Sequence, residues 1–198
     1  MRRTSVTTHA LHTDRAAPVS RSPQWDADTA VSTLYAAHWR QLVRLSVLLV
    51  RDLGTAEEVV QDAFIALHGR WQRLRDPDKA LAYLRQSVVN RSRSALRHRS
   101  VVARHVEKTS REPLPTGPGA DQQVLADEQR AAVLDALADL PRRQREVLAL
   151  RYYLDLSEAQ IAETLGISRG AVKSHASRGA AALRDRLGHL IGVTEEPR

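Results

Sequence analysis

Two serines that each open a helical pattern, with one glycine between the patterns, constrain the fold of this chain more than any other feature. In the stretch LSEAQIAETLGISRGAVKSHASR, residues 156–178, Ser157 and Gln160 have the spacing of a capping box. Gly166 stands where a helix C-terminus favours a left-handed residue, and Ser168 can cap a second helix. The pattern predicts two helices of about eight and about fifteen residues, separated by about three residues.

This arrangement is typical of a helix-turn-helix unit, whose second helix enters the major groove of DNA. Leu165 and Val172 are expected in the seam between the helices. The second helix should turn outward the side chains that suit phosphates and base edges: Arg169, Lys173, Ser174, Ser177 and Arg178, with His175 beside them. The alternative for the same residues is a helical hairpin that only packs.

The composition favours an all-α fold. Aromatic residues make up only 4% of the 198 residues, so the core must consist of Leu, Val, Ile and Ala, which suit helices better than sheets. The chain has no cysteine, which excludes disulfides and thiolate metal sites. No apolar run reaches the roughly 18–20 residues of a membrane span, and the polar N-terminus does not read as a secretion signal. We therefore expect a cytoplasmic protein.

The positive charge is concentrated in one segment. The chain has a formal charge of +7, and between Arg70 and Arg111 twelve Lys and Arg residues stand against three acids. No acid lies between Arg85 and Arg104 to form ion pairs within a helix, so an external polyanion is the better explanation than a solvated basic face. Only three of the 30 basic residues are lysines, a bias that fits a GC-rich genome such as that of an actinobacterium.

Helical periodicity divides the chain into two small domains. One helix is expected from Thr29 to the segment RDLGT, a second with Thr55 as N-cap and Glu58 completing a capping box, and a third opening at Asp76-Pro77. A helix restarting at Pro141 should run through Tyr153. The expected divisions are a tail over 1–27, a domain over 28–104, a flexible Pro- and Gly-rich linker over 105–122, a domain over 123–191 and a tail over 192–198.

Four segments together resemble bacterial RNA polymerase sigma factors of the extracytoplasmic-function type, in the sigma-70 superfamily. They are AEEVVQDAF (56–64), YLRQSVVNRSRSALR (83–97), LPRRQREVLALRYYLDLSEAQIAETLGISRGAVKS (140–174) and SRGAAALR (177–184). The resemblance spans about residues 29–190. It implies that the first domain is sigma region 2, that the second is region 4, and that the chain directs core RNA polymerase to promoters by recognising minus-35 and minus-10 elements and aiding melting.

The resemblance also implies partners and sites. Region 2 would dock on the β′ coiled coil of the polymerase through Glu57, Glu58, Gln61 and Asp62, although these acids could also serve only the helix that carries them. The minus-10 element would contact Arg85, Asn90, Arg91, Arg93 and Arg97, although Asn90 could instead be a packing amide. The helix-turn-helix would read minus-35, where Ala171 and His175 replace the Thr and Arg of many relatives. Further implied partners are the β flap and an anti-sigma factor.

A rival function from another class is a stand-alone helix-turn-helix regulator whose residues 29–100 form a dimerisation or sensing domain; a helical RNA-binding or anti-termination protein is a third. The sequence shows no HExxH motif, no glycine-rich phosphate loop and no ligand spacing among its eight histidines. We therefore expect no catalytic residue, no metal site, no cofactor and no enzymatic activity.

Overall fold

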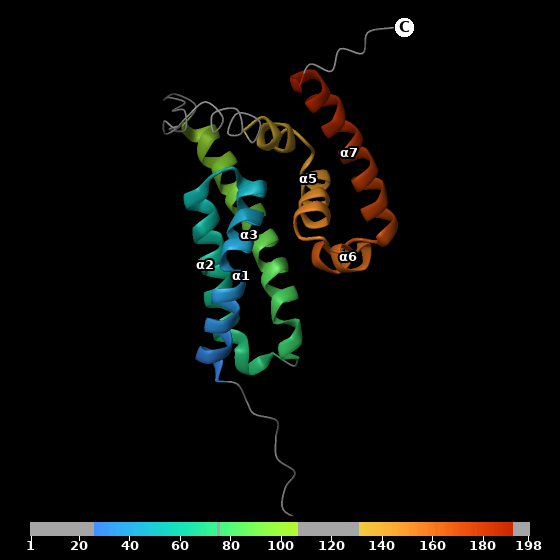
Figure 1. Ribbon diagram of the computed structural model, residues 1–198. Helices are drawn as coiled ribbons and strands as arrows, with labels where there is room; N and C mark the ends of the chain where they lie inside the picture. Colours follow the sequence, from blue (N-terminus) through green and yellow to red (C-terminus); the bar gives the residue numbers. More distant parts are fainter. Residues whose placement is uncertain (1–25, 75, 107–130, 192–198) are drawn as a thin grey trace, which may run out of the picture.

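The structure is a computed structural model that describes residues 26–74, 76–106 and 131–191, and these residues form helices joined by short turns (Figure 1). The N-terminal half contains α1 (Ala27–Val50), α2 (Leu53–Arg70), two short 3₁₀ helices (Trp71–Arg73 and Pro77–Lys79) and α3 (Ala80–Val106). The C-terminal half contains a helical segment over 131–138, α5 (Arg142–Leu148), a π-helical turn (Ala149–Tyr153), α6 (Glu158–Leu165) and α7 (Arg169–Ile191). The described residues include no strand, as the composition predicted.

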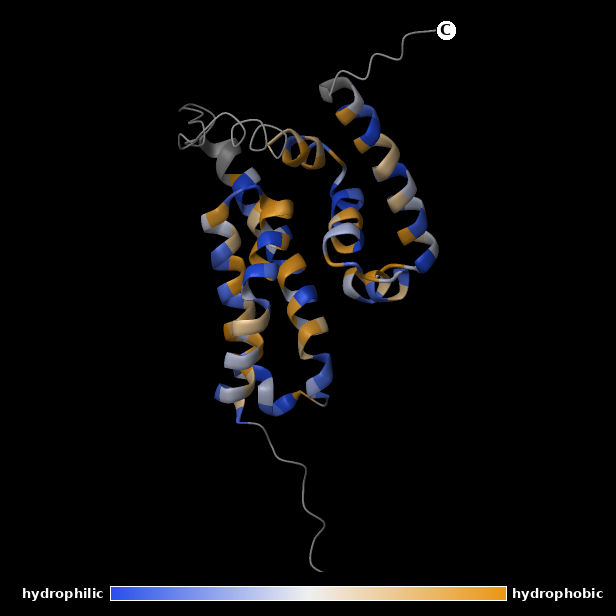
Figure 2. Ribbon diagram, in the orientation of Figure 1, coloured by the Kyte–Doolittle hydropathy of each residue, from blue (hydrophilic) through white to orange (hydrophobic). Residues whose placement is uncertain are grey.

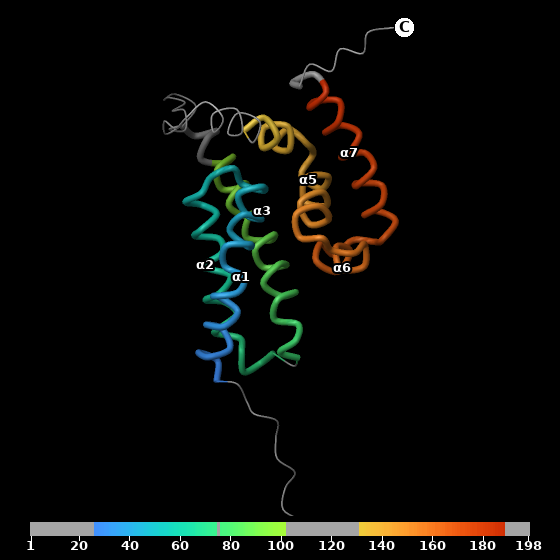
Figure 3. Tube along the Cα trace, viewed as in Figure 1, coloured from blue at the N-terminus to red at the C-terminus, as the bar shows by residue number. Residues whose placement is uncertain are grey.

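Helices α1, α2 and α3 pack side by side, as the Cα trace shows (Figure 3). Their spacing of apolar residues by three and four places one face of each helix in a common core. The buried side of α2 consists of apolar residues at helical spacing: Val59, Val60, Ala63, Phe64 and Leu67. Phe64 also contacts the ring of Tyr35 edge-on, with ring centroids 5.1 Å apart, which ties α2 to the N-terminal half of α1.

The cap predicted at Thr55 is wrong, because the N-cap of α2 lies three residues earlier. Arg51 takes the left-handed conformation that ends α1, with φ 60°, and Asp52 is the N-cap of α2. The Asp52 carboxylate accepts a hydrogen bond of 2.7 Å from the backbone N–H of Thr55, so Thr55 lies in the first turn and not before it. An aspartate caps a helix as well as threonine does, and one left-handed residue is enough to reverse the chain.

The start predicted at Asp76-Pro77 is confirmed, although the first turn is 3₁₀ and not α. The Asp76 carboxylate accepts from the backbone N–H of Asp78 at 3.1 Å, and Pro77 occupies the first helical position. The α-helical part, α3, then follows from Ala80. This start sets the rotation of α3, so that Leu84 and Val88 are buried while the arginine-rich face lies elsewhere.

The helix predicted from Pro141 to Tyr153 changes character at Ala149. Regular α-helix ends at Leu148, and a π-helical turn carries the chain to Tyr153. The turn buries Ala149 and Leu150 but leaves Tyr152 70% exposed. The π-helical turn thus places one large aromatic side chain, Tyr152, at the surface.

The cores of the two halves merge. A single cluster of buried apolar residues runs from the three-helix part through Val147, Leu150, Ile161, Leu165 and Val172. Figure 2 shows that apolar and hydrophilic residues alternate along the helices of both halves. The C-terminal half is therefore packed against α1 and α3, and the linker that joins the halves lies almost entirely outside the described residues.

Candidate nucleic-acid interface

The helix-turn-helix predicted from the two caps is present in α6 and α7. The Ser157 backbone N–H donates to the Gln160 side chain at 2.9 Å, and the Ser157 hydroxyl accepts from the Gln160 backbone, which completes the capping box. Gly166 has φ 64° and ends α6, after which the Ile167 N–H donates to the carbonyl of Ala162 at 3.1 Å. These bonds satisfy the backbone groups at the turn and fix the angle at which α7 leaves α6.

Helix α7 presents a polar, cationic face. Its cap is Ser168, whose hydroxyl accepts from the Ala171 N–H at 3.1 Å. Val172 and Ala176 face the core. Five of the six residues predicted to contact minus-35 DNA are exposed: Arg169, Lys173, Ser174, Ser177 and Arg178. The face therefore offers cations for phosphates and hydroxyls for base edges.

Lys173 and His175 of this face have surroundings that sequence reasoning did not include. The Lys173 ammonium lies 3.9 Å from the Glu158 carboxylate of α6, yet it remains 70% exposed. His175, the sixth predicted residue, is only partly exposed, and its Nδ1 is buried without a hydrogen-bond partner among the described residues. His175 is therefore turned further toward the protein than the other five.

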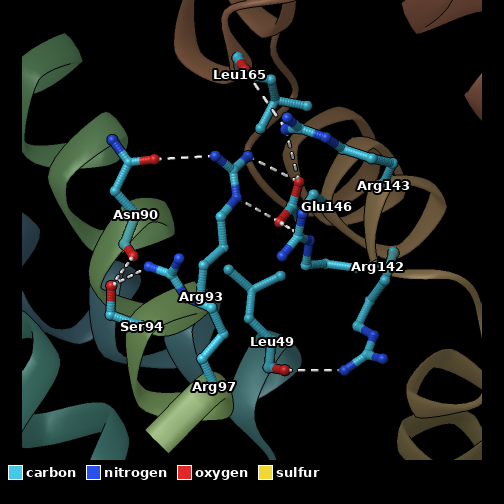
Figure 4. Close-up of polar contacts among 10 residues, drawn as sticks. Leu49, Asn90, Arg93, Ser94, Arg97, Arg142, Arg143, Glu146 and Leu165 are labelled. Atoms are coloured by element: carbon cyan, nitrogen blue, oxygen red, sulfur yellow. Dashed lines mark hydrogen bonds and ion pairs between the residues drawn. The ribbon is translucent and has the colours of Figure 1, made fainter.

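The arginines of α3 fall into two groups, and the first has acidic partners. Arg91 donates to Asp62 of α2 at 2.7 Å. Arg93 donates from Nε and Nη2 to the two carboxylate oxygens of Glu146, at 2.7 and 2.8 Å, and its side chain is only 15% exposed (Figure 4). As predicted, no acid of α3 itself pairs with these arginines. Acids from α2 and α5 do so instead.

The second group lies toward solvent or is partly buried without an acid. Arg97 and Asn90 are exposed, and the Asn90 side chain accepts from Arg93 at 2.9 Å, so Asn90 is not a buried packing amide. Arg85 is half-buried, its Nε has no partner among the described residues, and burial lowers the pKa of its guanidinium. Arg85 is therefore less accessible to DNA phosphates than its predicted role requires.

An open polar recess borders the exposed part of α3. Its volume is about 400 Å³, and its lining residues are Arg70, Tyr83, Gln86, Ser87, Asn90, Arg91 and Ser94. The Arg70 guanidinium lies over the Tyr83 ring, 5.7 Å from its centroid. The recess thus combines a flat aromatic surface, cations and amide groups, the set of groups that hold an unstacked base.

The acidic face of α2 is exposed as predicted, with Glu57, Glu58, Gln61 and Asp62 all accessible. Asp62 is bound to Arg91, so its charge is partly neutralised within the chain. Sequence reasoning missed Ile65, which is 61% exposed and lies one turn beyond Gln61 on the same row of α2. The spacing of four residues from Gln61 was a pattern that could have identified it.

An apolar groove between α5 and α7 was also missed. Its volume is about 520 Å³, and its lining residues are Leu148, Tyr152, Ala180, Leu183, Arg184, Leu187 and Gly188. The exposed Tyr152 ring at its edge results from the π-helical turn, which no pattern in the sequence indicated. A groove of this size and lining suits the apolar face of a helix.

The described part of the chain lacks a candidate metal site and a candidate membrane span. Across residues 26–74, 76–106 and 131–191, no cluster of three or more His, Cys, Asp or Glu residues could hold a metal ion. No helix in those ranges is long and apolar enough to cross a membrane.

Comparisons with known proteins agree with this arrangement. Residues 34–101 match sigma-70 region 2, and residues 130–183 match sigma-70 region 4. The RNA polymerase sigma-E factor of Streptomyces coelicolor is 35% identical over 146 residues, which cover 74% of this chain and 79% of the relative. The ECF RNA polymerase sigma factor SigL of Mycobacterium tuberculosis is 36% identical over 166 residues, which cover 81% of this chain and 90% of the relative.

Two solved structures share the fold. The sigma factor RpoE from Bartonella quintana, in complex with the anti-sigma factor NepR, superposes with a TM-score of 0.64 at 21% identity and covers 79% of this chain and 95% of its own. CnrH in complex with the cytosolic domain of CnrY gives 0.60 at 24% identity, over 84% of this chain and 97% of its own. With both sigma regions present in their order along the chain, and relatives of this similarity, the chain belongs to the sigma-70 family of RNA polymerase sigma factors, in the extracytoplasmic-function group.

Proposed function

We propose that this sigma factor directs core RNA polymerase to promoters by reading the minus-35 element with α7 and capturing the melted minus-10 strand beside α3. The observation that carries the proposal is the combination of two nucleic-acid surfaces in one chain. One is the exposed cationic face of a capped helix-turn-helix, and the other is an arginine-rich helix beside a polar recess. The first suits duplex DNA in the major groove and the second suits an unstacked base.

At minus-35, Arg169, Lys173 and Arg178 would contact phosphates or bases, and Ser174, Ser177 and His175 would add hydrogen bonds. At minus-10, the exposed Asn90 and Arg97 would meet the displaced strand, with Arg85, Arg91 and Arg93 contributing once the strand has approached. Binding energy from stacking and from phosphate contacts would then offset the cost of unstacking a base, so that melting follows from binding.

Docking on the polymerase would use two further surfaces. The acidic face of α2, Glu57, Glu58, Gln61 and Asp62 with the neighbouring Ile65, suits the β′ coiled coil, where it would present charge around an apolar contact. The apolar groove between α5 and α7 suits the β flap. An anti-sigma factor is a further partner that we propose, since the two solved neighbours were each determined with such a protein or with a cytosolic partner domain.

The proposed division of the chain is region 2 over 28–104, a linker over 105–122 and region 4 over 123–191, which agrees with the two family matches at 34–101 and 130–183. The protein would act in the cytoplasm, beside the polymerase, without catalytic chemistry of its own. We also propose an actinobacterial origin, which the arginine bias and the relatives from Streptomyces and Mycobacterium support.

Run-off transcription with purified core RNA polymerase tests the function. The expected result is transcripts with a defined start that require this protein. DNA binding by a stable dimer in the absence of polymerase, with no effect on transcription, would instead identify the stand-alone regulator. Lys173→Ala and Arg178→Ala should each weaken promoter use and lower the salt dependence of promoter binding by about one phosphate contact.

A matched control for these variants is Arg186→Ala. Arg186 is an exposed arginine of the same helix that pairs with Asp139, away from the turn that leads into α7. Its removal should leave the salt dependence unchanged. Equal losses for Arg186→Ala and Lys173→Ala would mean that the total charge of α7, and not its N-terminal face, supports binding.

A further inference from the structure

Two carboxylates of the C-terminal half pair with arginines of the N-terminal half: the exposed Asp135 with Arg51, and the buried Glu146 with Arg93. Glu146 of α5 is 2% exposed and accepts two parallel hydrogen bonds from Arg93 of α3, in the two-pronged geometry that gives the strongest arginine–carboxylate pairs (Figure 4). A carboxylate that has lost its water shell is tolerated only when cations and donors replace that shell. Arg93 is thus held by an internal anion at a position where the proposed function requires it to meet DNA phosphates.

Glu146 does not depend on Arg93 alone. Arg143, on the same helix, donates to the second oxygen of Glu146 at 3.2 Å, and the Arg142 Nε lies 3.8 Å from the first oxygen. If the halves separated, the carboxylate would keep two cations of its own helix and would regain water. Arg93 would become free of an acid and would keep its hydrogen bond to the Asn90 side chain.

Arg145, like Glu146, has partners both across the interface and within its own half. It donates across the interface to the carbonyl of Leu49 at the end of α1, at 3.0 Å. It also donates to the carbonyls of Ala138 and Leu140 in its own half, at 2.7 and 3.3 Å. Separation would therefore leave both charged groups of the α5 side with partners of their own, so opening costs less than the breaking of an ordinary buried ion pair.

The closed arrangement cannot serve both promoter elements at once. Elements centred on minus-35 and minus-10 lie about 25 base pairs apart, or roughly 85 Å along B-DNA at 3.4 Å per base pair. In the closed form α3 contacts α6. Because α6 is eight residues long, about 12 Å, and α7 starts four residues after its end, the start of α7 lies within about 30 Å of α3. The halves must separate before both elements are bound.

We propose that Glu146 acts as an internal substitute for a DNA phosphate: it occupies Arg93, holds regions 2 and 4 together, and is displaced when single-stranded nucleic acid binds. The identity of the competing anion, a nucleic-acid phosphate, rests on the proposed function. The contact between the halves through Arg93 and Glu146 does not depend on it. The free protein then binds a strand weakly because only its open fraction is competent, and the apparent dissociation constant rises in inverse proportion to that fraction.

Distance measurements on the full chain test the closure. The chain has no cysteine, so a Gln72→Cys, Ala181→Cys double variant places one dye on each half at exposed positions. Glu146→Gln, which keeps the shape but removes the charge, should lower the energy transfer between the dyes. Arg93→Gln, which breaks the same pair from region 2, should lower it too. Asp139→Asn, which removes an exposed ion pair within region 4, should leave it unchanged.

Binding of a random-sequence single-stranded oligonucleotide separates the role of each partner. Glu146→Gln should bind it roughly tenfold more tightly than the unmodified chain, because the open fraction rises while Arg93 remains. Arg93→Gln should open without this gain, because the released cation is missing. Unchanged energy transfer in both variants overturns the proposal, as does equal tightening in both. If Glu146→Gln loses helicity by circular dichroism, the energy transfer of Arg93→Gln alone decides.

The outcome is distinguishable from a failure of the proposed function. Opening and tighter strand binding in Glu146→Gln, without any stimulation of transcription by the unmodified chain, would support the internal anion and refute the sigma activity. Transcripts that require this protein, together with variants that show neither lower energy transfer nor tighter strand binding, would support the sigma activity and refute the internal anion.

Discussion

Replacing Gly179 with alanine should weaken the packing of α7 on α5, although alanine is the better helix former. An added Cβ at this position would lie 3.1 Å from the Cβ of Gln144 and 3.1 Å from the Cδ1 of Leu148. Carbon atoms pack best at about 3.5–4.0 Å, so both neighbours must yield by several tenths of an ångström. Leu148 can change its rotamer, but the Gln144 Cβ is fixed to the backbone, and α7 must therefore move away from α5.

The magnitude follows from two opposing effects. Gly to Ala in a helix interior gains about 1 kcal/mol from propensity, whereas overpacking of a well-packed contact costs about 1–3 kcal/mol. The net effect of Gly179→Ala is therefore a loss of about 0–2 kcal/mol in the free energy of unfolding. Gly188→Ala on the same helix, where no atom lies within 4 Å of the added carbon, should gain up to about 1 kcal/mol.

Urea denaturation followed by circular dichroism compares these two variants directly, since both make the same chemical change in one helix. A midpoint for Gly179→Ala that rises as much as the midpoint for Gly188→Ala would refute the close contact. Because Leu148 also lines the apolar groove, the same variant should weaken any partner that binds there.

Leu150→Ala should lower the free energy of unfolding by about 2–5 kcal/mol, because Leu150 is fully buried in the cluster that spans both halves. A single urea transition, shifted to lower concentration, is expected. Loss of helicity in two separate steps would mean that the halves do not share a core. Ser157→Ala should cost about 0.5–2 kcal/mol through loss of the capping box, measured by the same transition, and no change would mean that Gln160 alone satisfies the helix end. Hydrogen bonds from the side chain and then the backbone N–H of Thr55 lower the pKa of Asp52 below its ordinary value, and the Arg99 charge adds to this. The ionised carboxylate therefore stabilises the fold above the unfolded pKa, and that stability is lost as the pH falls through the folded pKa. Asp52→Asn, which keeps a capping side chain, should thus be destabilised at neutral pH by an amount that shrinks toward pH 3; a difference that stays constant with pH would exclude the charge as its cause.

The local parts of the structure could be predicted from the sequence because their causes are local. The caps at Ser157, Gly166 and Ser168 each involve residues within a few positions, and each is found where the pattern placed it. The prediction of a cap at Thr55 was wrong for a reason that is also local in sequence. Asp52 lies three residues earlier and offers an equally good acceptor. Two candidates competed for one helix end, and propensity alone does not rank aspartate below threonine.

The features that the sequence did not indicate all depend on contacts between distant segments. The π-helical turn that exposes Tyr152 is one such feature, since no residue type specifies it. The partial burial of Arg85 and His175 is another, because both sit on faces that α3 and α7 turn toward neighbouring elements only in the packed molecule. Periodicity shows which face of a helix is apolar, but it does not show what lies opposite the edges of that face.

The charge of α3 illustrates why this matters for function. Along the sequence, residues 85–104 contain no acid, and counting charges indicates a free cationic surface. In space, Arg91 reaches Asp62, 29 residues away, and Arg93 reaches Glu146, 53 residues away. The pair with Asp62 joins two helices of the N-terminal half and would persist in the proposed open form, whereas the pair with Glu146 joins the two halves and would break. Whether Arg93 is available to a nucleic acid therefore depends on the arrangement of the two regions. A count of charges along the sequence does not show this dependence.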